Sequence, residues 1–237
     1  MKIYAVSIKE ELSPCLYERF ISSVDHRKRE RIKAFKRDVD RKRSLVGDVL
    51  IRSMVSDGVI PNEMLKYEYN DHGKPRFVDM ENSHFNLSHA GEWVVAVVDS
   101  SPVGIDIEQM SDVDYEGIAR SFFHRDEVRW LLTQDTFLKR EAFYILWTLK
   151  ESFIKAIGKG LFIPLDSFSV EVDRLRHVSF NGEAHTIKPT FFTTMRWEED
   201  YVLSVASDTQ AGPVCVVTYD HIAHKIRTRA SAQRTFI

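Results

Sequence analysis

The chain has 237 residues, of which 43% are hydrophobic and 29% are charged. This size and composition suit one large domain or two modest ones around a real hydrophobic core. The formal net charge is −2, so overall charge points to neither nucleic acid nor a membrane surface. The two cysteines, Cys15 and Cys215, lack metal-ligand spacing, and we expect reduced thiols, although a disulfide between them stays open.

We expect a soluble protein of the cytoplasm. The first residues become polar too early for a signal peptide. No apolar run approaches the roughly 20 residues that a membrane-spanning helix needs.

The N-terminal part of the chain begins with a strand and a short helix. Residues 2–8 are rich in β-forming residues. Ser13 is a typical N-cap, and Pro14 suits the first helical position, so a helix is predicted from there to about Val24. Asp25 is suited to cap the next helix.

A strongly basic amphipathic segment follows. From Arg27 to Arg43 the sequence contains ten Lys or Arg residues and three acids, with Ile32, Phe35 and Val39 at helical spacing. We expect this helix to break near 37–40 and to resume as an apolar one. A solvated surface, a nucleic-acid patch and a pocket for the phosphates of a small molecule all stay open, although the exposed aromatics of a single-strand binder are missing.

A turn at residues 71–75 presents one ammonium group. It follows a short strand at 67–69, and Gly73 supplies the conformational freedom that the turn needs. Pro75 holds the preceding Lys74 in an extended conformation.

Two adjacent polar residues, Ser88 and His89, follow in the segment 85–89. No Gly-x-Ser-x-Gly elbow surrounds the serine, and neighbouring strand residues point to opposite faces, so a hydrolase nucleophile is disfavoured. A hydroxyl and an imidazole are suited to hydrogen-bond a phosphate.

The strongest strand signal is at residues 93–98, and a hairpin with residues 103–108 is predicted through the turn at Ser101 and Pro102. Alternation along the second strand places Asp106 and Glu108 on one face. Two neighbouring carboxylates repel each other unless a cation lies between them, and Mg²⁺ suits such hard oxygen ligands. A solvent-facing acidic strand end remains the alternative.

The centre of the chain is an amphipathic helix predicted from Glu141 to Gly158, after a helical region at 114–134. Glu151 and Lys155 lie one turn apart and share a face, either as an ordinary surface ion pair or as part of a site. Strands are predicted at about 167–172, 185–194 and 201–206, with a last candidate at 214–218. The basic end from His221 is expected to be frayed or disordered.

Three patches, at 85–89, 104–108 and 147–155, therefore occur in a fixed order, the last reading W-x-x-K-E-S-x-x-K. Together with the basic helix and the turn at 72–75, this set resembles the Sfp-type 4′-phosphopantetheinyl transferases. These enzymes activate carrier proteins of peptide and polyketide synthetases, including those of antibiotic biosynthesis. The resemblance runs from Met1 to about residue 206.

The resemblance implies an α+β fold of two similar α/β halves with pseudo-twofold symmetry, and coenzyme A in the cleft between them. We place the N-terminal half, with the basic helix, at 1–102 and the C-terminal half, with the magnesium site, at 103–206. Residues 207–237 form an extension without an assigned role. Smaller relatives, the holo-acyl-carrier-protein synthases, are half-length trimers, so the resemblance implies that this longer chain forms its site alone, as a monomer.

The implied reaction transfers the 4′-phosphopantetheine arm of coenzyme A to a serine of an apo peptidyl, aryl or acyl carrier protein and releases 3′,5′-ADP. By resemblance, Asp106, Glu108 and Glu151 bind Mg²⁺, and Lys155 lies near the phosphates of the donor. Glu151 and Lys155 are thus the catalytic candidates. The positions implied to hold coenzyme A are Lys28, Arg31, Ser44, Lys74, Pro75, Ser88 and His89. Among these, Arg31 and Ser44 are conservative variants of the residues expected in the family.

Two other functions remain open. The same acids would suit a Mg²⁺-dependent phosphohydrolase or nuclease. The basic helix could instead bind nucleic acid, which would leave the three acids without a role.

Overall fold

A computed structural model describes residues 1–56, 60, 62–78, 80, 82–172, 178–182 and 191–226. The chain forms two compact units. The first contains residues 1–69, 75–100 and the chain from Gly212 onward, and the second contains residues 70–74 and 101–211. Each unit has its own hydrophobic core.

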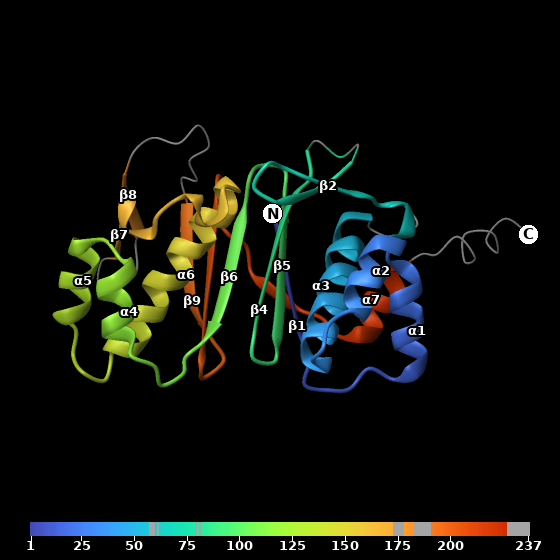
Figure 1. Ribbon diagram of the computed structural model, residues 1–237, viewed down its shortest axis with the longest axis horizontal. Helices are drawn as coiled ribbons and strands as arrows, with labels where there is room; N and C mark the ends of the chain where they lie inside the picture. Colours follow the sequence, from blue (N-terminus) through green and yellow to red (C-terminus); the bar gives the residue numbers. More distant parts are fainter. Residues whose placement is uncertain are drawn as a thin grey trace, which may run out of the picture. The chain divides into compact units, whose positions relative to one another are not determined.

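The first unit is built on a four-stranded sheet in the order β11-β1-β5-β4, with β1 parallel to β11 and antiparallel to β5. Figure 1 shows β1, β4 and β5 of this sheet. Its strands are β1 (Lys2–Ser7), β4 (His84–Ala90), β5 (Trp93–Asp99) and β11 (Val214–Val216), and a separate hairpin is formed by β2 (Tyr67–Tyr69) and β3 (Pro75–Phe77). Its helices are α1 (Pro14–Ser23), α2 (His26–Lys33), α3 (Asp38–Ser56) and α7 (Tyr219–Lys225).

The second unit has a three-stranded antiparallel sheet in the order β6-β10-β9 and a two-stranded one formed by β7 and β8. The strands are β6 (Gly104–Gln109), β7 (Phe168–Val172), β8 (Val178–Gly182), β9 (Phe191–Trp197) and β10 (Tyr201–Ser207). The helices are α4 (Tyr115–Phe122), α5 (Arg125–Leu132) and α6 (Lys139–Ile157). Residues 185–190 of the strand expected at 185–194 lie outside the described residues.

The α+β class is confirmed, and the two units share one theme. In the first unit the 19-residue helix α3 packs on β5, and in the second the 19-residue helix α6 packs on β6 and β10. The pseudo-twofold relation between the halves stays a prediction.

The local signals for helix ends are confirmed. The Ser13 hydroxyl accepts a hydrogen bond from the Leu16 N–H at 3.3 Å, and the Asp25 carboxylate accepts one from the Lys28 N–H at 2.9 Å. The basic segment breaks between α2 and α3. Gly158 ends α6 with φ 77°, the left-handed conformation that glycine adopts readily.

The hairpin predicted between residues 93–98 and 103–108 is wrong. β5 instead pairs with β1 and β4, and β6 pairs with β10. β5 is an inner strand of its sheet, because it pairs along both edges, and Val95 and Ala96, on its opposite faces, are both fully buried. The division between the two units falls directly after Ser100, in the turn that was expected to join the two strands of this hairpin.

The last strand candidate, at 214–218, is confirmed as β11, whereas the chain that follows it differs from the expected frayed end. β11 adds to the edge of β1, and α7 contacts α1 and α3 (Figure 1). Tyr219, Ile222 and Ala223 are buried, and the Thr218 hydroxyl caps the helix by accepting the His221 N–H at 3.2 Å. The expectation of a frayed end is therefore wrong for residues 221–225, and residues 227–237 lie outside the described residues.

Among the described helices, none is both long and apolar enough to cross a membrane.

Candidate active site

The acids of β6 lie against the C-terminal half of α6. A Cβ atom at Gly104 would overlap the carbonyl oxygen of Ser152 and lie 2.5 Å from the amide nitrogen of Ala156. Only glycine lets strand and helix approach so closely. The close contact brings Asp106 to Lys155, whose Nζ is 2.6 Å from the Asp106 carboxylate.

Burial and mutual repulsion dominate the electrostatics of these side chains. Burial, and then the charge of Asp106, raise the pKa of Glu108 to about 7, while Lys155 and a hydrogen bond from Trp147 oppose the shift. Burial and the same aspartate raise the pKa of Glu151, again opposed by Lys155. The three acids and Lys155 therefore act on one another electrostatically.

Three carboxylates and one ammonium group leave this cluster with an excess of negative charge, and their oxygen atoms are the donors that Mg²⁺ prefers. Among the side chains that the structure describes, no three acidic, histidine or cysteine groups converge as a metal cage. Instead, the Lys155 ammonium is the partner of Asp106. The donor chemistry of the three carboxylates fits a hard divalent cation.

Lys150, although it belongs to the same motif, lies in a closed buried ion pair. Its Nζ donates to both oxygens of the Glu127 carboxylate at 2.7 and 2.8 Å and to the Phe168 carbonyl at 2.8 Å. Glu127 also accepts the N–H groups of His124 and Val170. Both charged side chains are almost fully buried. Lys150 thus fastens α6 to α5 and β7 and is not available to a substrate.

Lys74 belongs to the second unit although it connects two strands of the first. Its ammonium donates to the carbonyls of Lys155 at 2.6 Å, Ala156 at 3.0 Å and Val103 at 3.3 Å. Burial lowers the pKa of Lys74 to about 8. The sequence could not indicate these partners, because all of them are distant along the chain.

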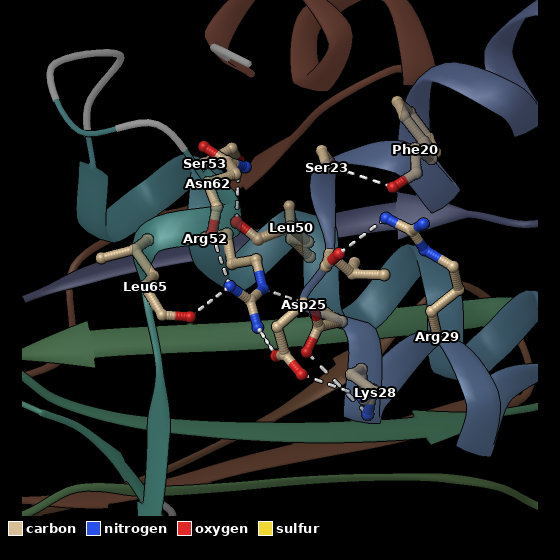
Figure 2. A network of polar contacts seen from close by, with 12 residues as sticks. Phe20, Ser23, Asp25, Lys28, Arg29, Leu50, Arg52, Ser53, Asn62 and Leu65 are labelled. Atoms are coloured by element: carbon tan, nitrogen blue, oxygen red, sulfur yellow. Dashed lines mark hydrogen bonds and ion pairs between the residues drawn. The ribbon is translucent and has the colours of Figure 1, made fainter. Parts of the chain in front are cut away.

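In the first unit, Lys28 extends from α2 and lies at the edge of a buried ionic network (Figure 2). Its Nζ is 3.9 Å from the Asp48 carboxylate, and its side chain is 23% exposed. Burial lowers the pKa of Lys28, partly opposed by Asp48. This lysine is both held by a carboxylate and reachable from solvent, a combination that suits an anionic ligand.

Arg52 is the centre of that network and is fully buried. Its guanidinium donates to Asp48 at 2.5 Å, to Asp25 at 2.7 Å, and to the carbonyls of Asn62 at 2.6 Å and Leu65 at 2.5 Å (Figure 2). Asp25 is also the cap of α2. One buried cation therefore fixes the start of the helix that carries Lys28.

The other residues predicted to hold the donor lie on neighbouring elements of the same unit. Arg31 is exposed on α2, close enough to lower the pKa of Lys28, and Ser44 is half-buried on α3. On β4, Ser88 is buried and His89 is exposed, the opposite orientations expected in a strand. Pro75 begins β3. α3 contacts both α2 and β4.

Sequence reasoning missed Arg52, Asp48 and Glu127. A signal existed for the first two, because they are four residues apart within the otherwise apolar run of α3. A charged i, i+4 pair on a buried helix face indicates an internal ion pair. Glu127 carried no such signal, because its partner lies on another helix.

Comparison with known proteins gives the same family in both halves of the chain. A sequence profile described as "4′-phosphopantetheinyl transferase, N-terminal" matches residues 12–101, and one described as "4′-phosphopantetheinyl transferase superfamily" matches residues 102–206.

Individual relatives extend the match over nearly the whole chain. The 4′-phosphopantetheinyl transferase ffp of Bacillus subtilis is 38% identical over 224 residues, covering 93% of this chain and 99% of the relative. The transferase Sfp of Bacillus subtilis (strain 168) is 37% identical, covering 94% and 100%. The transferase gsp of Aneurinibacillus migulanus is 39% identical, covering 74% and 73%.

Proposed function

Since the chain belongs to the 4′-phosphopantetheinyl transferase superfamily and is a transferase of this kind, we propose that its donor is coenzyme A and its acceptor the serine hydroxyl of an apo carrier protein. The serine oxygen attacks the β-phosphorus of the pyrophosphate. A new phosphodiester bond forms, the bond to 3′,5′-ADP breaks, and the serine proton passes to a base.

The observation that carries this proposal is the pairing of Lys155 with Asp106, in a cluster that also contains Glu108 and Glu151. Transfer of a phosphoryl-type group depends mainly on positioning and on stabilising negative charge. Lys155 is proposed to stabilise the negative charge that builds on the leaving group, because its ammonium is partly exposed and lies within the cluster, 2.6 Å from the Asp106 carboxylate.

Mg²⁺ is proposed to be held by Asp106 and Glu108, with Glu151 as a further ligand. When bound, the ion would neutralise charge on the pyrophosphate. Glu151 has a second role open to it, as the group that accepts the serine proton directly or through water. Its raised pKa makes it a better proton acceptor, and general-base help is typically worth about 10²–10⁴ in rate.

On the donor side, we propose that the first unit binds the parts of coenzyme A that do not react. Lys28 and Arg31 offer positive charge on α2, His89 offers an imidazole on β4, and Ser44 and Ser88 offer hydroxyls. Pro75, which begins β3, stays in this set as a proposed rigid contact for coenzyme A. The ammonium of Lys74 already has three backbone partners, so a direct contact with a phosphate would compete with them.

The setting proposed for this reaction is a monomer in the cytoplasm that serves carrier domains of peptide or polyketide synthetases. Both cysteines, Cys15 and Cys215, are exposed free thiols.

The direct test is the intact mass of an apo peptidyl carrier protein after incubation with the enzyme, coenzyme A and Mg²⁺. The expected result is the gain of one phosphopantetheine arm, prevented by EDTA and by replacing the acceptor serine of the carrier with alanine. Hydrolysis of coenzyme A at the same rate with and without a carrier, and no mass gain on peptidyl or acyl carriers, would contradict the proposal.

A further inference from the structure

The turn between β2 and β3 is built to hold one lysine in place. The Gly73 N–H donates to the Asn70 carbonyl at 2.9 Å, with Gly73 at φ +84°. The Asn70 side-chain oxygen accepts the N–H groups of His72 at 3.0 Å and Lys74 at 2.8 Å. A turn closed by both backbone and side-chain bonds has little freedom, so Lys74 leaves it in a fixed direction.

That direction leads to the C-terminal end of α6. The last carbonyls of a helix have no partner within the helix. Lys74 donates to two of them, those of Lys155 and Ala156, and the Asn70 side-chain amide donates to the Gly158 carbonyl at 2.9 Å. A Cβ atom at Gly158 would lie 2.7 Å from the Lys74 side chain, so the lysine packs directly on the helix end.

The third acceptor of Lys74 lies on another element. The Val103 carbonyl, 3.3 Å from its Nζ, directly precedes β6. Asp106 and Glu108 are on β6, whereas Glu151 and Lys155 are on α6. One ammonium group thus joins the two elements that carry the acids and the lysine of the proposed active site.

We propose that Lys74 is a positioning residue, which with Asn70 fixes the end of α6 against β6 so that Lys155 and Glu151 face Asp106 and Glu108. Only the expected effect of Lys74 on the rate of transfer rests on the proposed function. An ammonium group has three hydrogens, and three carbonyls accept them here. Lys74 therefore acts on the reaction through Lys155 and not by reading a phosphate of the donor.

The test compares Lys74→Met, which keeps the stem of the side chain and removes the ammonium, with Lys159→Met, which removes an exposed charge just beyond the same helix. For Lys74→Met we expect kcat to fall about 10- to 100-fold, because a small displacement of Lys155 and Glu151 from their reactive positions slows the reaction by such a factor. We expect the KM for coenzyme A and the preference for coenzyme A over dephospho-coenzyme A to stay within about twofold. Lys159→Met should change none of these values.

Amide hydrogen exchange gives a readout that does not depend on transfer. Residues 152–158 should exchange faster in Lys74→Met than in the wild type or in Lys159→Met, because the helix end has lost its partner. If the wild type transfers nothing, the proposed function fails, while faster exchange would still support the positioning contact.

Asn70→Asp provides a milder variant should Lys74→Met not fold. It keeps the oxygen that closes the turn and removes the amide that holds Gly158, so exchange at 155–158 should rise and kcat should fall by a smaller factor. A rise in KM confined to coenzyme A with kcat unchanged in Lys74→Met would overturn the proposal. So would a loss of kcat with unchanged exchange in either variant.

Discussion

Each unit contains a fully buried cation, and the two are held differently. In the second unit, Lys150 is paired with one carboxylate, that of Glu127. The other hydrogen bonds of Glu127 come from backbone N–H groups of the same unit. In the first unit, Arg52 faces Asp48 and Asp25, and the network continues to Lys28, which solvent can reach.

This difference separates two uses of buried charge. The pair of Lys150 and Glu127 specifies how α5, α6 and β7 pack. Its hydrogen-bonding groups are used by partners inside the unit, so they are not available to a ligand. The open network around Arg52 supports the fold and also sets the charge and position of a residue at the surface. We therefore expect substitutions in the Arg52 network to weaken the binding of the donor. Substitutions in the Lys150–Glu127 pair should lower the stability of the fold alone.

The largest stability effect is expected for Lys150→Met. The change leaves Glu127 buried without its cation, a situation that costs about 3–5 kcal/mol in other proteins. Urea unfolding should show this loss, and the double variant Lys150→Met, Glu127→Gln should recover part of it, because glutamine removes the unpaired charge and keeps an acceptor oxygen. The KM for coenzyme A of the folded fraction should stay at the wild-type value. An altered KM would show that the pair is not closed.

A somewhat smaller effect is expected for Arg52→Met, at about 2–4 kcal/mol, because Lys28 can partly replace the lost cation beside Asp48. Here the KM for coenzyme A should also rise several-fold, since the cap of α2 loses a partner and Lys28 moves toward Asp48. Steady-state kinetics at saturating carrier would measure it. An unchanged KM in a destabilised but folded Arg52→Met variant would contradict the claim that the Arg52 network, unlike the Lys150–Glu127 pair, influences donor binding.

The smallest effect concerns Lys74, a third sequestered cation whose partners are backbone carbonyls. Its pKa is about 8 in the folded chain, below the ordinary value of 10.5. Between these values the unfolded chain binds more protons than the folded one, so stability should rise with pH from about 8 to about 10. The rise should be weaker in Lys74→Met when urea midpoints are compared across this range. Parallel curves for the two proteins would contradict the assignment.

What the sequence could predict was local chemistry. The caps at Ser13 and Asp25, the glycine that ends α6 and the alternation of Asp106 and Glu108 depend on neighbours within a few residues, and each appeared where expected. Strand pairing depends on partners far along the chain. Local pattern therefore predicted that β5 pairs with β6. The actual partner of β6 is β10, almost a hundred residues later in the chain.

The same limit applies to the site. The acids and Lys155 could be grouped because each motif is compact, and their order along the chain resembles one family. The partners of Lys74 and Arg52 come from other elements, so their roles could not be predicted from spacing. The basic composition from His221 onward predicts a frayed end, yet Ile222 and Ala223 share one buried face of α7 with Tyr219.

The most direct test of the account is the Mg²⁺ dependence of transfer by Asp106→Asn, measured as intact mass of the carrier over time. The change preserves shape and removes the charge that pairs with Lys155 and is proposed to hold the ion. We expect transfer to fall at least about 10²-fold, as the loss of several kcal/mol of charge stabilisation implies. The exposed Asp135→Asn should behave as the wild type does. Near-normal, Mg²⁺-dependent transfer by a folded Asp106→Asn would contradict the proposed metal site.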